Sequence, residues 1–157
     1  MNSIIDNVKK CKTLSFLFVF YKIFDTLQLE TGDKMNSTNL DKEHIIQSGE
    51  LYRINGLLKS IENSITNNSI KTKTNEHAIL LKNVILYLKE RTQNINIEPN
   101  TGEIYRVNSL LENLKEAIKI EAIFPTTDET KILLNLIVNY LEDRKNNLNN
   151  KQTHSLK

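Results

Sequence analysis

Apolar residues recur at steps of three and four along residues 48–67, which is the spacing of one face of an α-helix rather than of a strand. The same stripe returns 53 residues later in the chain. The paired positions are Leu51, Ile54, Leu58, Ile61 and Ile65 in the first stretch, and Ile104, Val107, Leu111, Leu114 and Ile118 in the second. We therefore expect two equivalent helices, with Ser48 and Thr101 as their N-caps and a short lead-in helix from about Leu40.

Two further helices are predicted over about 75–93 and 128–147. They carry the apolar sets Leu81, Val84 and Leu88, and Leu134, Ile137 and Leu141, again 53 residues apart. Residues 67–71 and 123–125 interrupt the periodicity. Thr74 and Thr127 then precede acidic residues that suit the positive end of a helix. Each long helix should thus turn back on the next one as an αα-hairpin.

An internal duplication explains why the helices recur. The segment Gly49-Glu50-Leu51-Tyr52-Arg53-Ile54-Asn55 returns as Gly102-Glu103-Ile104-Tyr105-Arg106-Val107-Asn108. A self-similar period of this size is typical of a repeated supersecondary unit that buries its apolar face on its neighbour. The pattern predicts an all-α protein: two tandem αα-hairpin repeats with a 53-residue period form a four-helix core. Repeat 1 covers about 48–93, repeat 2 about 101–147, and the domain spans 35–147.

Residues 1–34 lie outside the duplicated pattern. They contain an apolar run from Leu14 to Phe24 that is shorter than the roughly 20 residues of a spanning helix. We expect an apolar N-terminal helix that docks on the core. A membrane-associated or targeting segment remains an alternative, as does an extension that the fold does not need, since Met35 could serve as a second start. Residues 148–157 show no apolar period and are expected to be a disordered tail.

Composition narrows the class of protein. A hydrophobic content of 39% and a net charge of +2 are those of a soluble globular protein, and the balanced charge gives no reason to expect a polyanion or membrane partner. Cys11 is the single cysteine, which rules out an intrachain disulfide and fits a cytoplasmic location. The pattern sets no oligomeric state.

The duplicated positions also hold the candidate site. All four arginines in the chain, Arg53, Arg91, Arg106 and Arg144, belong to the repeat. Antiparallel packing of each hairpin should place Glu50 opposite Arg91 and Glu103 opposite Arg144, all at one end of the bundle. We interpret these two pairs as structural ion pairs that set the register of each hairpin, because the Arg fork matches a carboxylate.

Arg53 and Arg106 receive no carboxylate in this geometry, so we expect them to face outward beside Tyr52 and Tyr105. Arginine and tyrosine are enriched at binding hot spots. These four residues are therefore the candidate binding site for a protein partner. The pattern leaves open an alternative, in which Arg53 and Arg106 bind nucleic acid or another anionic ligand.

Signatures of catalysis are missing from the sequence. No Glu-x-x-His spacing, glycine-rich phosphate loop or nucleophile elbow is present, and no histidine recurs between the repeats. We expect no enzyme, no cofactor and no metal. The sequence favours a non-enzymatic protein-binding module, either an adaptor or a small inhibitor of the immunity type, while a membrane-associated factor held by residues 14–24 is a further alternative.

Overall fold

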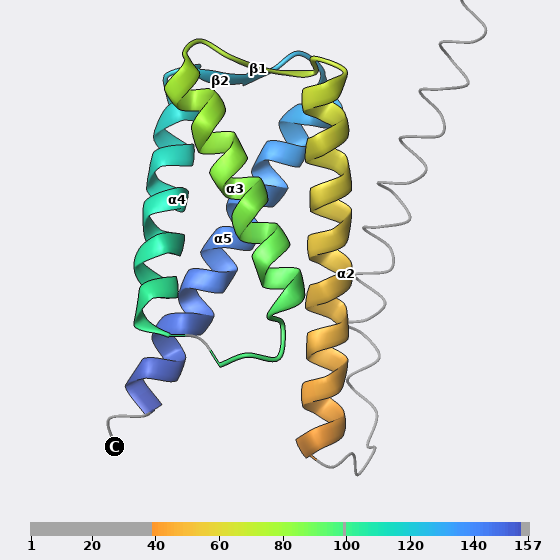
Figure 1. Cartoon of the computed structure of the whole chain (residues 1–157), viewed down its shortest axis with the longest axis vertical. Helices are drawn as coiled ribbons and strands as arrows, with labels where there is room; N and C mark the ends of the chain where they lie inside the picture. Colours follow the sequence, from red (N-terminus) through yellow and green to blue (C-terminus); the bar gives the residue numbers. More distant parts are fainter. Residues whose placement is uncertain (1–38, 99, 155–157) are drawn as a thin grey trace, which may run out of the picture. The chain divides into compact units, whose positions relative to one another are not determined.

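The computed structural model describes residues 39–98 and 100–154, and four α-helices make up most of this part of the chain (Figure 1). They are α2 (Asn39–Thr66), α3 (Asn75–Gln93), α4 (Thr101–Lys119) and α5 (Asp128–His154). The predicted all-α class is confirmed. The expected N-terminal helix in residues 1–34, with its alternatives, lies outside the described residues.

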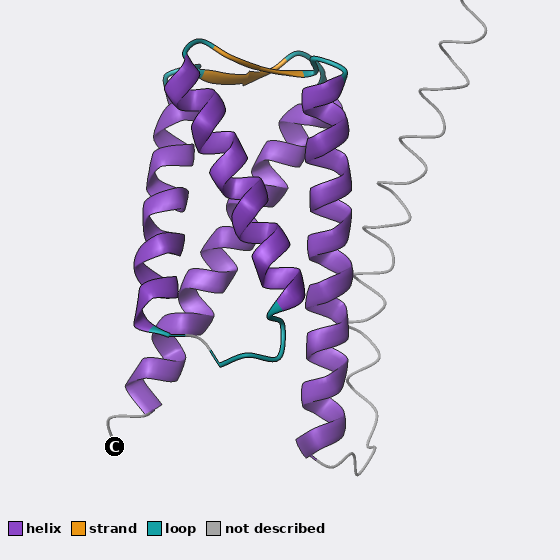
Figure 2. Cartoon of the chain, in the orientation of Figure 1, coloured by secondary structure: helices purple, strands orange, loops and turns teal. Residues whose placement is uncertain are grey.

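A two-stranded antiparallel sheet joins the two helix-to-helix connections (Figure 2). Strand β1 (Ile70–Thr72) pairs with β2 (Ile123–Pro125), with Lys71 opposite Phe124 at the centre. We had expected both segments only to interrupt the helices. Three-residue strands are stable only when paired, and here each partner lies about 53 residues away, beyond the reach of local pattern.

The two connections leave their helices in the same way. Asn68 and Glu121 follow α2 and α4 with φ angles of 58° and 54°, in the left-handed region. The next amides close the helix ends: Ser69 N donates to Ser64 O, and Ala122 N donates to Ala117 O, both at 2.8 Å. This is the Schellman arrangement, which turns the chain from the helix into the strand.

The helix starts differ in part from expectation. Thr74, which precedes the acidic first turn, caps α3 by accepting a hydrogen bond from His77 N. The N-cap of α4 is Asn100 and not Thr101, since Asn100 Oδ1 accepts from Glu103 N at 2.9 Å. Ser48 caps nothing: α2 runs unbroken from Asn39, and Ser48 Oγ donates to His44 O inside it. A Ser-Gly pair costs a helix only about 1 kcal/mol, too little to separate the lead-in helix from α2.

All four helices supply residues to the core, and α3 and α5 cross between α2 and α4 in the view of Figure 1. The predicted apolar stripes supply most of it. The largest side chains with almost no exposed surface are Ile54, Ile61, Val84, Leu88, Val107, Leu111, Leu114, Ile123, Leu134, Ile137, Leu141 and Leu148. The described residues from 42 onward form one compact unit around this core.

The last helix is longer than expected. We expected a disordered tail over residues 148–157, but α5 continues to His154 and Leu148 is only 1% exposed. A single apolar residue among asparagines carries no periodic signal, yet the Leu148 side chain is part of the core. Residues 155–157 are not described. Among the helices of the described part, none has the length and apolar content needed to cross a bilayer.

Candidate functional site

The ends of the helices opposite the β1–β2 sheet carry a network of charged and phenolic groups, which we call the network end. At its centre Glu50 of α2 accepts two hydrogen bonds from Arg91 of α3, from Nε and Nη2, both at 3.1 Å. Tyr140 Oη of α5 donates to the same carboxylate at 3.0 Å. The Arg91 side chain is 7% exposed, so these contacts replace the water that would otherwise solvate its guanidinium group.

The second half of the chain repeats the arrangement. Arg144 of α5 donates to Glu103 of α4 from Nε at 2.9 Å and from Nη2 at 3.1 Å. Tyr87 Oη of α3 donates to Glu103 at 3.1 Å. Arg144 Nη1 also lies 4.0 Å from Glu50 Oε1, which joins the two clusters. The structure thus places Glu50 beside Arg91 and Glu103 beside Arg144, the two pairs that antiparallel packing predicted.

The network shifts the pKa values of several of its members. Burial by itself raises the pKa of Glu50, but the hydrogen bonds and charge of Arg91, with Arg144 and Tyr140, outweigh it and hold that pKa below its usual value. For Tyr87 and Tyr140, burial and the nearby carboxylates raise the pKa. Both phenols therefore stay protonated, and remain hydrogen-bond donors, at neutral pH.

Arg53 and Arg106 do not lie as we expected, because each has a carboxylate partner. Arg53 Nη1 lies 2.8 Å from Asp143 Oδ2, and Arg106 Nη1 pairs with Glu90. Each guanidinium also covers a tyrosine ring: Arg53 lies 5.3 Å from the centroid of Tyr140, and Arg106 lies 5.5 Å from that of Tyr87. Sequence reasoning missed these partners because it considered only contacts within each hairpin.

A signal for the missed partners exists in the sequence. Glu90 and Asp143 lie 53 residues apart, and both are acidic, as expected if both copies of an arginine need a carboxylate. The tyrosines of the helical turn below, Tyr87 and Tyr140, keep the same spacing. The pairs cross between the halves of the chain, so only a three-dimensional arrangement assigns them.

Tyr52 and Tyr105, the other two candidate binding residues, lie on the outer sides of α2 and α4. Their exposed fractions are 54% and 73%. Each directly precedes one of the paired arginines, so the structure brings the four candidates to the network end on two helices. Large exposed aromatics on rigid helices lose little conformational entropy when a partner covers them.

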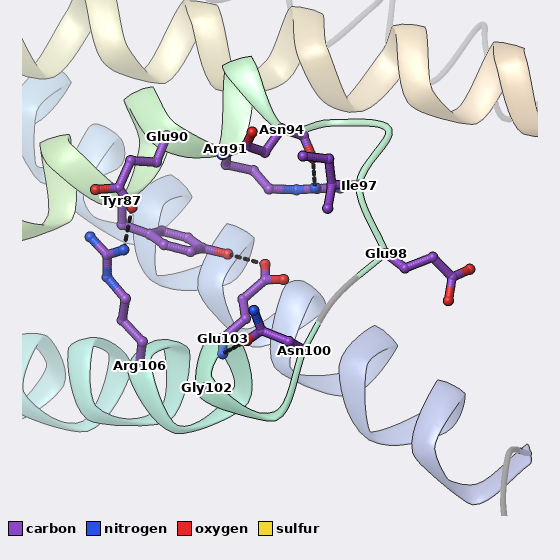
Figure 3. A pocket seen from close by; sticks show the side chains of 10 residues that line it. All are labelled: Tyr87, Glu90, Arg91, Asn94, Ile97, Glu98, Asn100, Gly102, Glu103 and Arg106. Carbon is purple, nitrogen blue, oxygen red and sulfur yellow. Dashed lines mark hydrogen bonds and ion pairs between the residues drawn. The ribbon is translucent and has the colours of Figure 1, made fainter.

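A pocket of about 320 Å³ opens at the network end, between the end of α3, the loop that follows it and the start of α4 (Figure 3). Tyr87 and Arg106 form one wall, and Arg91, Asn94 and Ile97 form another. Arg91 fixes the loop, since Nη1 donates to Asn94 O at 2.7 Å and Nη2 to Ile95 O at 3.1 Å. The remaining lining residues are Glu90, Glu98, Asn100, Gly102 and Glu103.

Every arginine of this pocket is neutralised by a carboxylate of the protein. Arg91 is held by Glu50, and Arg106 by Glu90. The lining therefore offers hydrogen-bonding groups and a little apolar surface, without a net positive charge. Among the described residues, no group of His, Cys, Asp and Glu side chains could hold a metal ion.

These features define an all-α protein with a buried ionic network at one end of its helices. Comparison of the chain with protein-family models, with curated proteins and with solved structures gives no match. The geometry of the network end is therefore the basis for a functional proposal.

Proposed function

We propose that the chain is a non-enzymatic protein-binding module, an adaptor or a small inhibitor of the immunity type, that meets its partner with the network end. We infer further that its two halves are copies of one αα-hairpin unit with a period of 53 residues. The contact residues in this proposal are Tyr52, Arg53, Tyr105 and Arg106. A single cysteine and no possible intrachain disulfide support action in the reducing cytoplasm.

One observation carries the proposal: Tyr105, 73% exposed, lies next to an arginine that is already fixed in position. Arg106 is held by Glu90 and by the ring of Tyr87, so its side chain does not need to be ordered on binding. Tyrosine and arginine are the residue types that most often contribute strongly to protein interfaces. The pocket beside Arg106 offers space for one side chain of a partner.

The carboxylate partners of Arg53 and Arg106 weigh against the alternative of an anionic ligand. A phosphate or a nucleic acid would have to compete with Asp143 and Glu90 for the same guanidinium groups. Such competition removes much of the gain expected from neutralising a phosphate. A protein surface can instead contact the tyrosine rings and the outer edges of the arginines without breaking the pairs.

Photocrosslinking tests the proposal in the organism that makes the protein. A benzophenone amino acid replaces Tyr105 in one variant and Tyr52 in another. A matched control carries it at Lys71, an exposed residue of β1 at the opposite end of the helices. We expect a discrete crosslinked protein from positions 105 and 52 and none from position 71.

The competing outcomes are distinct. Excess unlabelled wild-type protein should suppress the crosslink. A Tyr105→Ala competitor should need a concentration about tenfold higher, or more, for the same suppression. Equal crosslinking from all three positions would refute the network end as the contact surface. Salt-sensitive crosslinking to nucleic acid in place of protein would support the anionic alternative and overturn the proposal.

A further inference from the structure

Several contacts between the two halves of the chain come in reciprocal pairs. We call residues 39–93 the first half and residues 101–154 the second half. Tyr140 donates to Glu50 at 3.0 Å across the boundary, and its counterpart Tyr87 donates to Glu103 at 3.1 Å in the opposite direction. The second contact follows from the first when each residue is replaced by its counterpart 53 positions away in the other half: Glu50 by Glu103, and Tyr140 by Tyr87.

The same exchange holds at both ends of the helices. At the network end, Arg53 pairs with Asp143 while Arg106 pairs with Glu90. At the sheet, Lys71 pairs with Phe124, which is its own counterpart 53 residues later, so the exchange leaves this central pair unchanged. The flanking bonds are reciprocal as well: Lys73 N donates to Ala122 O at 2.9 Å, and Thr126 N donates to Ser69 O at 2.8 Å.

A half-turn about the vertical axis of Figure 1 exchanges α2 with α4 and α3 with α5. The core follows the same exchange, because each buried apolar residue of the first half has an apolar counterpart that is buried in the second. These pairs are Ile54 and Val107, Leu57 and Leu110, Leu58 and Leu111, Ile61 and Leu114, Ile70 and Ile123, Leu81 and Leu134, Val84 and Ile137, Tyr87 and Tyr140, and Leu88 and Leu141.

An interface in which residue i contacts j while j contacts i is isologous, the type found between the identical subunits of a two-fold dimer. Such a surface complements itself. We propose that the inner face of the second half is a binding surface for the second half of another copy of this chain. The surface lies between the halves, so this inference does not depend on the function of the network end.

The self-paired arrangement has defined contacts. Tyr140 would donate to Glu103 of the second copy, in place of Glu50, and Arg106 would pair with Asp143 of the second copy, in place of Glu90. Both replacements keep the charge and the type of each group. Each contact occurs twice, once on either side of the two-fold axis, so a single substitution changes two contacts in the dimer.

A full-length variant whose first half cannot pack tests the proposal. Ile61→Asp with Leu88→Asp places two carboxylates at fully buried core positions of α2 and α3. We expect this variant to be dimeric by light scattering, with a helical signal about half that of the wild type and a melting temperature that rises with protein concentration.

A charge reversal with rescue distinguishes the proposed contact from non-specific association. Asp143→Arg is added to the Ile61→Asp/Leu88→Asp variant. In the dimer it places an arginine opposite Arg106 of the other copy at both symmetric positions. The two repulsive contacts should raise the dimer dissociation constant about tenfold or more. A further Arg106→Asp substitution restores opposite charges and should restore the affinity. A dimer that does not respond to these charge changes would overturn the proposal.

A mirror variant provides the control for folding. Leu114→Asp with Leu141→Asp makes the matched change in the second half, at the counterpart positions. Mixing the two variants allows an intact first half to meet an intact second half, which is the pairing of the wild-type chain. If only the mixture folds, the second half does not complement itself and the proposal fails. If neither the mixture nor the first variant folds at concentrations up to about 1 mM, pairing between chains is refuted altogether.

Discussion

Removing the Glu50 carboxylate should destabilise the protein far more than removing a surface carboxylate of the same helix. In Glu50→Ala, the Arg91 guanidinium loses both of its hydrogen bonds to that carboxylate, and Tyr140 Oη loses its acceptor. Arg91 keeps only the carbonyls of Asn94 and Ile95. The Arg91 guanidinium, whose side chain is only 7% exposed, is then left with its positive charge and without a carboxylate partner.

The magnitude follows from the burial of the pair. Breaking a buried ion pair by removing one partner costs about 3–5 kcal/mol, and a side chain of Glu50 that is 21% exposed indicates the lower end, about 3 kcal/mol. At about 4 °C per kcal/mol for a unit of this size, the melting temperature should fall by about 12 °C. The matched control is Glu62→Ala, which breaks the exposed pair with Lys89 and should cost about 0.5 kcal/mol.

Urea denaturation of the variants at pH 7, followed by circular dichroism at 222 nm, measures these losses. A double-mutant cycle with Arg91→Ala isolates the coupling, and Glu103→Ala should reproduce the loss of Glu50→Ala because Glu103 has matching partners. A loss below about 1 kcal/mol in Glu50→Ala, or a loss no larger than that of Glu62→Ala, would show that the buried ion pair does not stabilise the fold.

Three further predictions concern pH, a helix end and the last helix. The folded-state pKa of Glu50 is below its unfolded value, so the stability that its carboxylate contributes is complete above about pH 4.5 and is lost as pH falls through the folded pKa. A Glu50→Gln variant should therefore lose less stability on acidification than the wild type, as measured by urea midpoints. Glu121→Gly should raise the free energy of unfolding by about 1 kcal/mol, since Glu121 has a φ of 54°. Asn68→Gly should raise it less, because asparagine tolerates this conformation. Equal effects of the two substitutions would contradict this explanation. Leu148→Ala should lower the melting temperature and reduce the free energy of unfolding by about 2–4 kcal/mol. Asn149→Ala should change that free energy by no more than about 0.5 kcal/mol. Equal stability of the two variants would show that the end of α5 does not pack on the core.

Much of the site was predictable because it lies within single hairpins. The partners Glu50 and Arg91 follow from helix periodicity and a short connection, which fix the antiparallel register. The partners of Arg53 and Arg106 do not follow, since Asp143 and Glu90 come from the other half of the chain. That arrangement turned two arginines expected to be unpaired into fixed elements of the network.

The sequence by itself determined the helices and their order, since a 3.6-residue period is a local property and the 53-residue similarity shows which segments are equivalent. Only the tertiary structure decided what joins the halves: the β1–β2 pairing, the crossed tyrosine and arginine contacts, and the burial of Leu148. These contacts link positions 16 to 90 residues apart that lie in different hairpins, or depend on one isolated side chain. Local periodicity does not record such contacts, because it describes a single segment and each contact needs two segments that only the fold brings together.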